Sequence, residues 1–358
     1  MNKVTVLVID DSALIRQLLS ELLNADPDIE VIATARDAFD AREKIKKFNP
    51  DVLTLDVEMP KMDGVTFLKN LMRLHPLPVV MISTMTEQGA KVTIEALEEG
   101  AIDFVAKPKI NVLKTLESYA DEIVNKVKIA AKANVNALEF LQQNTYKIQE
   151  LSVDRVVRKQ VTNAAILESN NGGKIVGIGA STGGTKAIGE ILSHLSLSCP
   201  AIVIAQHIPV TFSDAFAARL NKKCEIEVCV AEDGQQILAG HAYIAPGDKH
   251  LTVETKDGLY FCKLNDAPAV NLHKPSVDVL FGSLAKNVGA NAIGLMLTGM
   301  GADGAKGMLE MKTAGAFNFV QDKSSSVVWG MPSQAVKIGA AELQLPLKDI
   351  AAKLMERA

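Results

Sequence analysis

The sequence has no long apolar run, few cysteines and no excess of positive charge. In 358 residues no apolar stretch approaches the roughly 20 residues of a membrane span, which argues against direct membrane insertion. The four cysteines show neither a Cys-x-x-Cys pair nor zinc-type spacing, so we expect reduced thiols that lie mostly in cores. The net charge of −4 argues against a nucleic-acid partner. Acidic residues follow Ile9 too early for a secretory signal, so we expect a cytoplasmic protein.

Length and composition indicate two globular domains. The chain is 48% hydrophobic and 22% charged, and it is long enough to bury two cores. Strand patterns alternate with helix patterns in both halves, which predicts an α/β protein with two doubly wound, mostly parallel sheets. We expect domains at 1–132 and 174–358. The polar, glycine-terminated segment 133–173 is predicted to be a linker, with a short docking helix around Leu138–Leu141 as the alternative.

Five apolar runs in the first domain predict the strands of one parallel sheet. The runs are short and nearly continuous, as expected for strands that are buried on both faces. Helical patterns occur at Ala38–Phe48, Gly89–Glu99 and Glu117–Ala131. The predicted strands are Val4–Ile9, Ile29–Ala33, Val52–Leu55, Val79–Ile82 and Ile102–Val105.

Polar residues follow four of these strands at their carboxyl ends. In a doubly wound sheet such positions line one crevice. Three carboxylates repel one another there, so a divalent cation such as Mg²⁺ would neutralise them, and a hydroxyl and an amine beside them suit a phosphoryl group. A single aspartate at a strand end more often caps a helix, but this reading does not account for so many polar strand ends. The residues are Asp10, Asp11, Asp56, Ser83 and Lys107.

The second domain shows a similar pattern of strands and helices. A hairpin is expected around Val253–Leu264. The predicted strands are Ile175–Ile178, Ala201–Ala205, Ile226–Val230, Ala242–Ile244, Leu259–Leu264, Ile293–Leu297 and Ala316–Val320. The predicted helices are Lys186–Leu195, Thr211–Asn221, Ser276–Val288, Gly304–Ala314 and Pro332–Ile338.

Three strand ends of the second domain carry candidate catalytic residues. The segment KIVGIGASTGG at 174–184 predicts a strand, a glycine-rich turn and a helix, and such a turn projects Ser181 above the sheet edge. His207 follows the second strand in IAQHIP, and Asp303 follows a later strand in LTGMGADG. These positions predict a Ser-His-Asp triad, in which His207 accepts the proton of Ser181 and Asp303 orients the imidazole ring.

Other interpretations of the same residues stay open at this point. A dinucleotide-binding GxGxxG begins at Gly177, but position 182 is threonine and no acidic residue ends the next strand. A GxSxG pattern fits Gly179–Gly183, yet the order Ser, His, Asp differs from the Ser, Asp, His order of α/β-hydrolases. Asp303 is also placed to cap the helix at Gly304–Ala314, and a lone histidine such as His207 is often only a polar or capping residue.

The first domain resembles the receiver domain of two-component response regulators. The segments IDDSALIR, LDVEMPKMDG, ISTMT and DFVAKP carry this resemblance. It implies a flavodoxin-like fold in which Asp56 accepts a phosphoryl group. The other implied site residues are the Mg²⁺ ligands Asp10, Asp11 and Asp56 with the backbone carbonyl of Glu58, the switch hydroxyl Ser83, and Lys107, which contacts the phosphoryl group.

The second domain resembles the catalytic domain of the chemotaxis protein-glutamate methylesterases, the CheB family. GIGASTGG, AQHIP, YIAPGDKH, KPSVDVLF, LTGMGADG and VVWGMPSQA carry this resemblance. It implies a Rossmann-like three-layer fold and the triad Ser181, His207 and Asp303. It also places Thr182 and Met300 at the active site, where neighbouring backbone N–H groups would form an oxyanion hole. No cofactor is expected in this domain.

The two resemblances together imply a phosphorylation-activated esterase. Its substrates would be glutamate methyl esters on chemoreceptors, and the same chemistry would deamidate receptor glutamines. A chemotaxis histidine kinase would supply the phosphoryl group. A different class of function is a receiver joined to a catalytically silent nucleotide- or protein-binding domain, and this alternative predicts that Ser181 does not react with serine-directed reagents.

Overall fold

The structure is a computed structural model that describes residues 3–84, 86–107, 113–135, 137 and 173–357. Contacts divide the chain into two compact units, Met1–Gln142 and Gln143–Ala358. Nearly all of the predicted linker at 133–173, and the alternative docking helix, lie outside the described residues. None of the described helices combines the length and apolar character that crossing a membrane requires.

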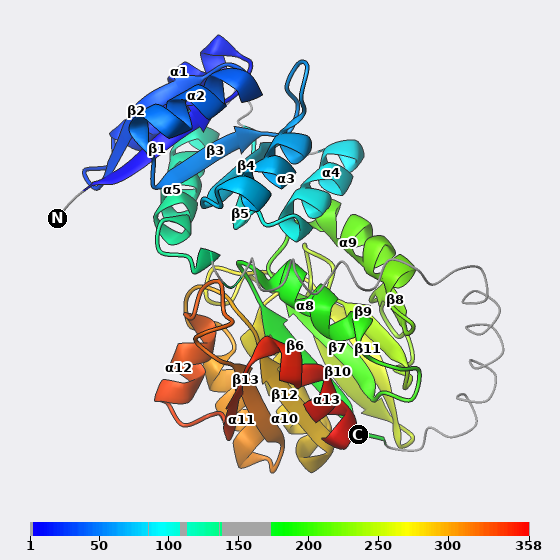
Figure 1. The fold of residues 1–358 in the computed structure, drawn as a ribbon. Coiled ribbons are helices and arrows are strands. Elements are labelled where there is room, and N and C mark those ends of the chain that lie inside the picture. Colours follow the sequence, from blue (N-terminus) through cyan, green and yellow to red (C-terminus); the bar gives the residue numbers. More distant parts are fainter. Residues whose placement is uncertain (1–2, 85, 108–112, 136, 138–172, 358) are drawn as a thin grey trace. The chain divides into compact units, whose positions relative to one another are not determined.

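The first unit contains a five-stranded parallel sheet in the order β2-β1-β3-β4-β5 (Figure 1), which confirms the predicted fold. Helix α1 contacts α5, whereas α3 contacts α4. The strands are β1 (Val4–Ile9), β2 (Ile29–Ala35), β3 (Val52–Asp56), β4 (Val79–Ser83) and β5 (Asp103–Ala106). The helices are α1 (Ala13–Asn24), α2 (Ala38–Phe48), α3 (Gly64–Leu74), α4 (Glu87–Glu98) and α5 (Leu113–Ala130).

The second unit contains a seven-stranded parallel sheet in the order β14-β13-β12-β6-β7-β9-β8, and a separate hairpin of β10 and β11. Its strands are β6 (Ile175–Ala180), β7 (Ala201–Gln206), β8 (Glu227–Val230), β9 (His241–Ile244), β10 (His250–Lys256), β11 (Leu259–Asn265), β12 (Ala292–Met296), β13 (Phe317–Gln321) and β14 (Leu343–Leu345). Its helices are α8 (Gly184–Ser193), α9 (Val210–Lys223), α10 (Val277–Asn287), α11 (Ala305–Thr313), α12 (Met331–Lys337) and α13 (Leu347–Arg357), with a 3₁₀ turn η1 (Gly289–Asn291).

Helices cover both faces of the second sheet (Figure 1). The helix α8 connects β6 to β7 in one direction along the sheet, whereas α11 connects β12 to β13 in the other direction. Right-handed crossovers therefore place them on opposite faces. Contacts agree, because α8 packs against α9 and α13, and α11 packs against α10 and α12. Every residue of β6, β7 and β12 is buried as a result.

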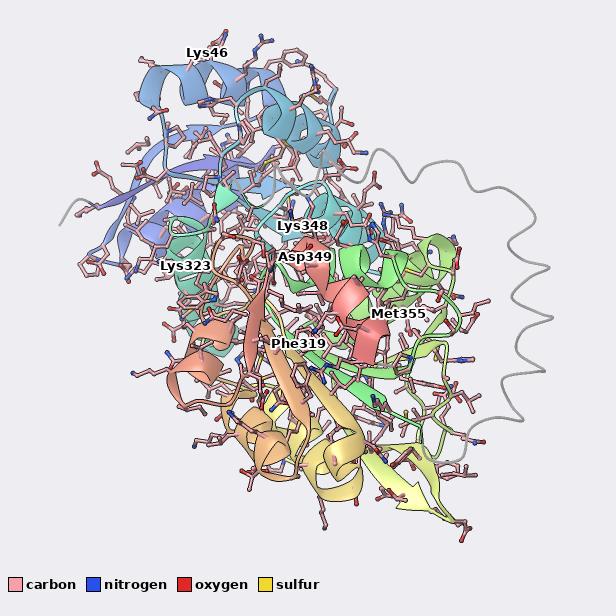
Figure 2. The ribbon with its side chains drawn as sticks, turned by 60° about the horizontal axis from the view of Figure 1, so that its bottom comes forward. Lys46, Phe319, Lys323, Lys348, Asp349 and Met355 are labelled. Carbon is pink, nitrogen blue, oxygen red and sulfur yellow. The ribbon has the colours of Figure 1, made fainter. Side chains whose placement is uncertain are left out.

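The last helix is amphipathic and was not predicted from the sequence. In α13, Leu347, Ile350 and Leu354 are buried, whereas Lys348 and Asp349 are exposed (Figure 2). Figure 2 also labels Phe319 of β13, whose side chain is fully buried. The preceding edge strand β14 is only three residues long and mostly exposed, so it lacks the apolar run that marks the other strands.

Gly247 allows two loops of the second unit to approach closely. A Cβ atom at this position would lie 2.3 Å from the backbone atoms Ile208 O, Pro209 C and Val210 N, in the segment that follows His207. We expect Gly247→Ala to lower the free energy of unfolding by about 1–3 kcal/mol, because backbone cannot yield as a side chain does. Urea unfolding followed by the fluorescence of Trp329, the single tryptophan of the chain, measures this unit.

Gly173→Ala is the matched control, because a Cβ at Gly173 would meet no atom within 4 Å. This control should unfold at the wild-type urea concentration. An unchanged midpoint for Gly247→Ala would contradict the packing argument.

Candidate functional site

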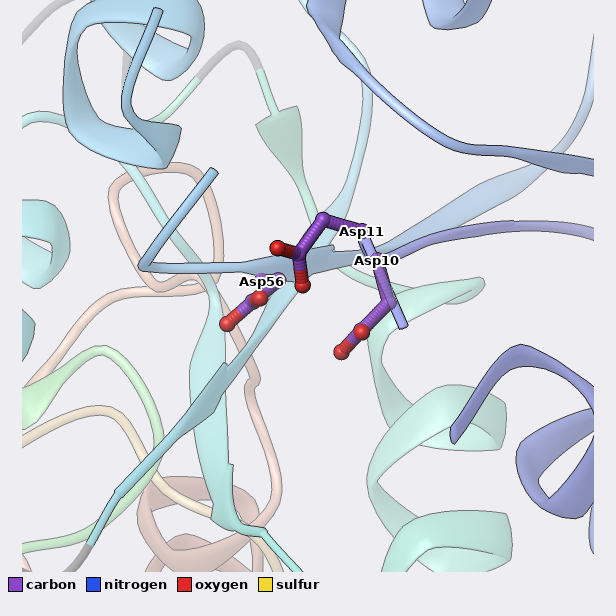
Figure 3. Close-up of side chains that lie close together, drawn as sticks. All are labelled: Asp10, Asp11 and Asp56. Atoms are coloured by element: carbon purple, nitrogen blue, oxygen red, sulfur yellow. The ribbon is translucent and has the colours of Figure 1, made fainter. Parts of the chain in front are cut away.

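Three aspartates meet at the carboxyl edge of the first sheet (Figure 3). Ile9 of β1 pairs with Leu55 of β3, so the next residues, Asp10 and Asp56, lie side by side. One carboxylate oxygen from each of Asp10, Asp11 and Asp56 lies within 4.8 Å of the others. Asp10 and Asp56 are fully buried, whereas Asp11 is exposed. The strand register thus brings together the acidic residues that the sequence singled out.

Lys107 faces the two buried carboxylates. Its Nζ lies 2.8 Å from Asp56 Oδ2 and 3.4 Å from Asp10 Oδ2. Burial, reinforced by the charge of Asp10 and opposed by Lys107, raises the pKa of Asp56 to about 6. Burial also raises the pKa of Asp10. One lysine therefore does not fully offset the cost of two buried negative charges.

The cluster fits a divalent cation. Lys107 lies at ion-pair distance, but Asp10 Oδ2 and Asp56 Oδ2 are buried and accept no well-directed hydrogen bond from the described residues. Carboxylate oxygens are the ligands that Mg²⁺ prefers, and the three aspartates form an acidic cluster typical of a receiver Mg²⁺ site. Glu58 lies beside it, since its backbone N–H donates to Asp56 Oδ1 at 3.2 Å.

Ser83 ends β4 on the same sheet edge, and its hydroxyl is engaged with α4. Thr93 Oγ1 donates to Ser83 Oγ at 2.6 Å and also lies 2.8 Å from the carbonyl of Gly89. Both Ser83 and Thr93 are buried. The serine that the sequence marked as a switch is therefore held by the first turns of α4 in this structure.

Ser181 lies on the turn between β6 and α8. Its backbone N–H donates to the carbonyl of Thr298, and its carbonyl accepts from Gln206 Nε2 at 2.9 Å. Gly183 precedes the helix with a φ of 77°, a left-handed conformation that favours glycine. The side of this turn is tight, because a Cβ on Gly299 would lie 2.8 Å from Ser181 Cβ. The half-buried serine is thus fixed at a strand-to-helix turn, as the sequence predicted.

His207 lies on the neighbouring strand end. Its backbone N–H donates to the carbonyl of Ala180, the residue before Ser181. The ring Nε2 lies 2.9 Å from Asp303 Oδ2, whereas Nδ1 is buried and has no partner among the described residues. An ionised carboxylate only accepts hydrogen bonds, so Nε2 carries the proton and the neutral ring keeps a lone pair on Nδ1.

Asp303 is surrounded by hydrogen-bond donors. Besides His207, it accepts from Asn271 Nδ2 at 2.8 Å, from Ser276 Oγ at 2.8 Å and from the backbone N–H of Val277 at 2.7 Å. Burial alone would raise the pKa of Asp303, but the hydrogen bonds from His207, Asn271 and Val277 hold it well below its usual range. The carboxylate therefore stays ionised although it is buried.

The side chain of Asp303 bonds to the N-terminus of α10 and not to α11, the helix that follows it in the sequence. The residue before α11 is Gly304, which makes no side-chain capping bond. The amides of Val277 and Asp278 at the start of α10 donate to Asp303 instead. The interpretation of Asp303 as a cap of the helix at Gly304–Ala314 is therefore wrong, and its position at a different helix N-terminus favours its negative charge.

A second histidine and serine join the same network. His250 Nδ1 accepts from the backbone N–H of Ser276 at 3.1 Å, and His250 Nε2 lies 3.1 Å from the carbonyl of Pro268. Ser276 Oγ lies 2.8 Å from Asp303 Oδ1 and caps α10. Ser276 thus links the two other residues, because its backbone N–H bonds to His250 and its hydroxyl bonds to Asp303. The three have the residue types of a triad, and the sequence reasoning missed this network.

His273 stacks on His207. The ring centroids lie 3.7 Å apart, and the ring planes differ by 13°. Burial, helped by the proximity of His207, lowers the pKa of His273 to about 4. The sequence does not single out His273, because a lone histidine next to a proline-containing segment has no catalytic spacing.

The two predicted support residues lie on the loops around Ser181. Thr182 is buried, and its carbonyl accepts from Thr298 Oγ1 at 3.0 Å. Met300 follows Gly299, the residue that approaches Ser181, and is 46% exposed. Both residues therefore lie near the serine turn.

Fold and site together define a receiver-type unit followed by an α/β unit with a serine, histidine and aspartate at its sheet edge. The family model described as response regulator receiver domain matches residues 6–117, and that described as CheB methylesterase matches residues 176–354. The chain belongs to the CheB methylesterase family.

Similar proteins cover the whole chain. A protein-glutamate methylesterase/protein-glutamine glutaminase of Hydrogenovibrio crunogenus is 56% identical over 371 residues, with 99% of each chain covered. A protein of the same name from Nitrosomonas europaea is 50% identical over 357 residues, and the match covers 100% of this chain and 97% of that protein. The crystal structure of the Thermotoga maritima CheB methylesterase catalytic domain is 38% identical with a TM-score of 0.51, and covers 52% of this chain and 99% of that chain.

The lowered pKa of His273 predicts a pH-dependent stability. The unfolded residue titrates near 6.5 and the folded one near 4, so acidification through this window protonates the unfolded chain first and lowers the free energy of unfolding. We expect His273→Gln to flatten this dependence between pH 6.5 and 4, with little change in its slope above pH 6.5. Urea unfolding at a series of pH values, followed by Trp329 fluorescence, measures it. Parallel curves for variant and wild type would contradict the assignment.

Proposed function

We propose that the protein is a phosphorylation-controlled protein-glutamate methylesterase and protein-glutamine glutaminase that acts on chemoreceptors in the cytoplasm. Relatives that match the full chain at 50% identity or more are named protein-glutamate methylesterase/protein-glutamine glutaminase. The observation that carries the proposed chemistry is the state of His207: Nε2 is bonded to Asp303, while buried Nδ1 is unpartnered among the described residues beside the Ser181 turn.

The proposed mechanism follows from these positions. His207 Nδ1 takes the proton of Ser181 Oγ as the oxygen attacks the ester or amide carbonyl, and the ionised Asp303 stabilises the imidazolium. The protonated ring then donates to the leaving group, which departs as methanol or ammonia. Water attacks the resulting acyl-serine with His207 again as the base, and receptor glutamate is released. Backbone N–H groups beside Thr182 and Met300 would stabilise the oxyanion.

We favour Ser181 and His207 over Ser276 and His250 as the reacting pair. Both ring nitrogens of His250 face backbone groups, so neither is free to accept a hydroxyl proton. Ser276 is fully buried, and its hydroxyl already serves Asp303 and α10. Ser276 and His250 therefore suit a supporting role around Asp303.

Ser181→Ala tests this assignment. We expect it to lower kcat for methanol release from methylated receptor membranes by about 10⁴-fold or more, because loss of the nucleophile removes the covalent step. Ser276→Ala is the matched control, since it deletes one hydrogen bond to Asp303 and should retain measurable turnover. Full activity of Ser181→Ala, or its loss only in Ser276→Ala, would contradict the Ser181 mechanism.

In the first unit, we propose that Asp56 accepts a phosphoryl group from a chemotaxis histidine kinase. Asp10, Asp11, Asp56 and the carbonyl of Glu58 would hold Mg²⁺, which supplies positive charge to balance the phosphoryl oxygens when it is bound. Lys107, already 2.8 Å from Asp56, would contact the phosphoryl group. Ser83 would leave Thr93 to bind one of its oxygens.

Phosphorylation would act on the second unit by relieving inhibition. A phosphoryl group adds about −1.5 to −2 charges, which suffices to bias a two-state contact. We propose that the unphosphorylated receiver restricts access to Ser181 and that phosphorylation of Asp56 weakens this restriction.

Asp56→Asn separates control from chemistry. We expect a small phosphodonor to accelerate methanol release by the wild type but not by this variant. Basal release should stay measurable, because Asp56 is not part of the proposed esterase site.

A chain that starts at Lys174 should be active without phosphodonor. A truncated chain no faster than the unphosphorylated whole protein would contradict inhibition by the receiver.

A further inference from the structure

The turn between Val270 and His273 has an unusual residue at its tip. Val270 and His273 exchange two backbone hydrogen bonds, of 3.0 and 2.9 Å, so the turn has two central residues. Both central residues have positive φ, 52° at Asn271 and 69° at Leu272. Two positive φ values are those of a type I′ turn, which favours asparagine at its first position and glycine at its second. Leucine is therefore the exception.

The same unit contains a turn that follows the rule. The hairpin of β10 and β11 turns at Asp257 and Gly258, with φ values of 51° and 77°. Leu272 stands where Gly258 stands in that hairpin, although a branched side chain is costly in this conformation. Local backbone preference thus does not explain Leu272.

Internal packing does not explain Leu272 either. The residue is 95% exposed, the highest value among the described large apolar residues. A strained position and an exposed apolar side chain are each unfavourable in the isolated protein. Features that violate local rules without an internal gain concentrate at functional sites.

The turn is firmly attached to the candidate active site. Asn271 Nδ2 lies 2.8 Å from Asp303 Oδ1 and 2.7 Å from Asp278 Oδ2. His273 stacks on the His207 ring at 3.7 Å. Leu272 lies between these two anchors, so its side chain is projected to solvent at a fixed place beside His207. Exposed Met300 lies on the loop that carries Asp303, three residues before it.

We infer that Leu272 is a substrate-contact residue that binds an apolar surface of the receptor next to the glutamate side chain under attack. This inference rests on the proposed function, because it requires a protein substrate. A methyl ester alone offers little surface, whereas the protein around it can cover Leu272 and so offset its exposure. Leu272 would then help to select a folded receptor over a small ester.

Leu272→Gly in the full chain, assayed with phosphodonor, tests the inference. We expect kcat/KM for methylated receptor membranes to fall about tenfold, mainly through a higher KM, since a covered leucine side chain stabilises an interface by that order. Hydrolysis of a small ester should be unchanged. A suitable one is N-acetylglutamate with a γ-methyl ester and an α-carboxamide. The melting temperature should equal or exceed that of the wild type, because glycine relieves the strain.

Asp257→Gly is the matched control, as it makes the same kind of change in the regular turn, and it should behave as the wild type in both assays. Leu272→Asn, which tolerates positive φ but is polar, should reproduce the loss on receptors. Co-sedimentation with receptor membranes in the Ser181→Ala background measures binding without turnover, and Leu272→Gly should weaken it.

Unchanged receptor turnover and binding in Leu272→Gly would overturn the inference. An equal loss on both substrates would overturn it too, because the turn would then only support His207. Higher basal turnover without phosphodonor would assign Leu272 to a contact with the receiver instead. If the wild type releases no methanol from receptors, the proposed function fails, and the co-sedimentation result still decides whether Leu272 contacts them.

Discussion

The Asp303 carboxylate is the interaction on which the second unit's site depends. It joins the loop after β12 to His207 at the end of β7, to Asn271 of the Val270–His273 turn and to the first amide of α10. A buried charge is tolerated only when donors replace its water shell. Removing this carboxyl group, as in Asp303→Ala, would leave donors from three separate segments without their acceptor, so the site and the local fold are stabilised by the same contacts.

The two units treat buried carboxylates in opposite ways. Asp303 is supplied with enough donors to hold its pKa below the usual range. Asp56 has one lysine and one backbone amide, and burial raises its pKa to about 6. A fully compensated carboxylate suits a group that orients another residue, whereas an under-compensated one suits a group that gains a cation and a phosphoryl group. The difference in solvation matches the difference in proposed role.

The sequence alone predicted the candidate site residues that follow the ends of strands. Apolar runs predicted the two parallel sheets, and the residues after them include Asp10, Asp56, Ser181 and His207. It was insufficient where partners are remote: Ser276 and Asn271 reach Asp303 from 27 and 32 residues away, and no periodicity records such a contact. The strand β14 was missed because it is an exposed edge strand of three residues and therefore has no apolar run.

Strand pairing also determines which side chain stands beside the serine. Ala180 pairs with Gln206, and this register sets Ser181 next to His207 on adjacent strands. Gln206 reinforces it through its side-chain bond to the Ser181 carbonyl. Side chains alternate along a strand, so a slip of one residue would present glutamine instead of imidazole. Gln206 therefore stabilises the correct register of β6 and β7, and a chain that paired these strands one residue out of register would not bring His207 beside Ser181.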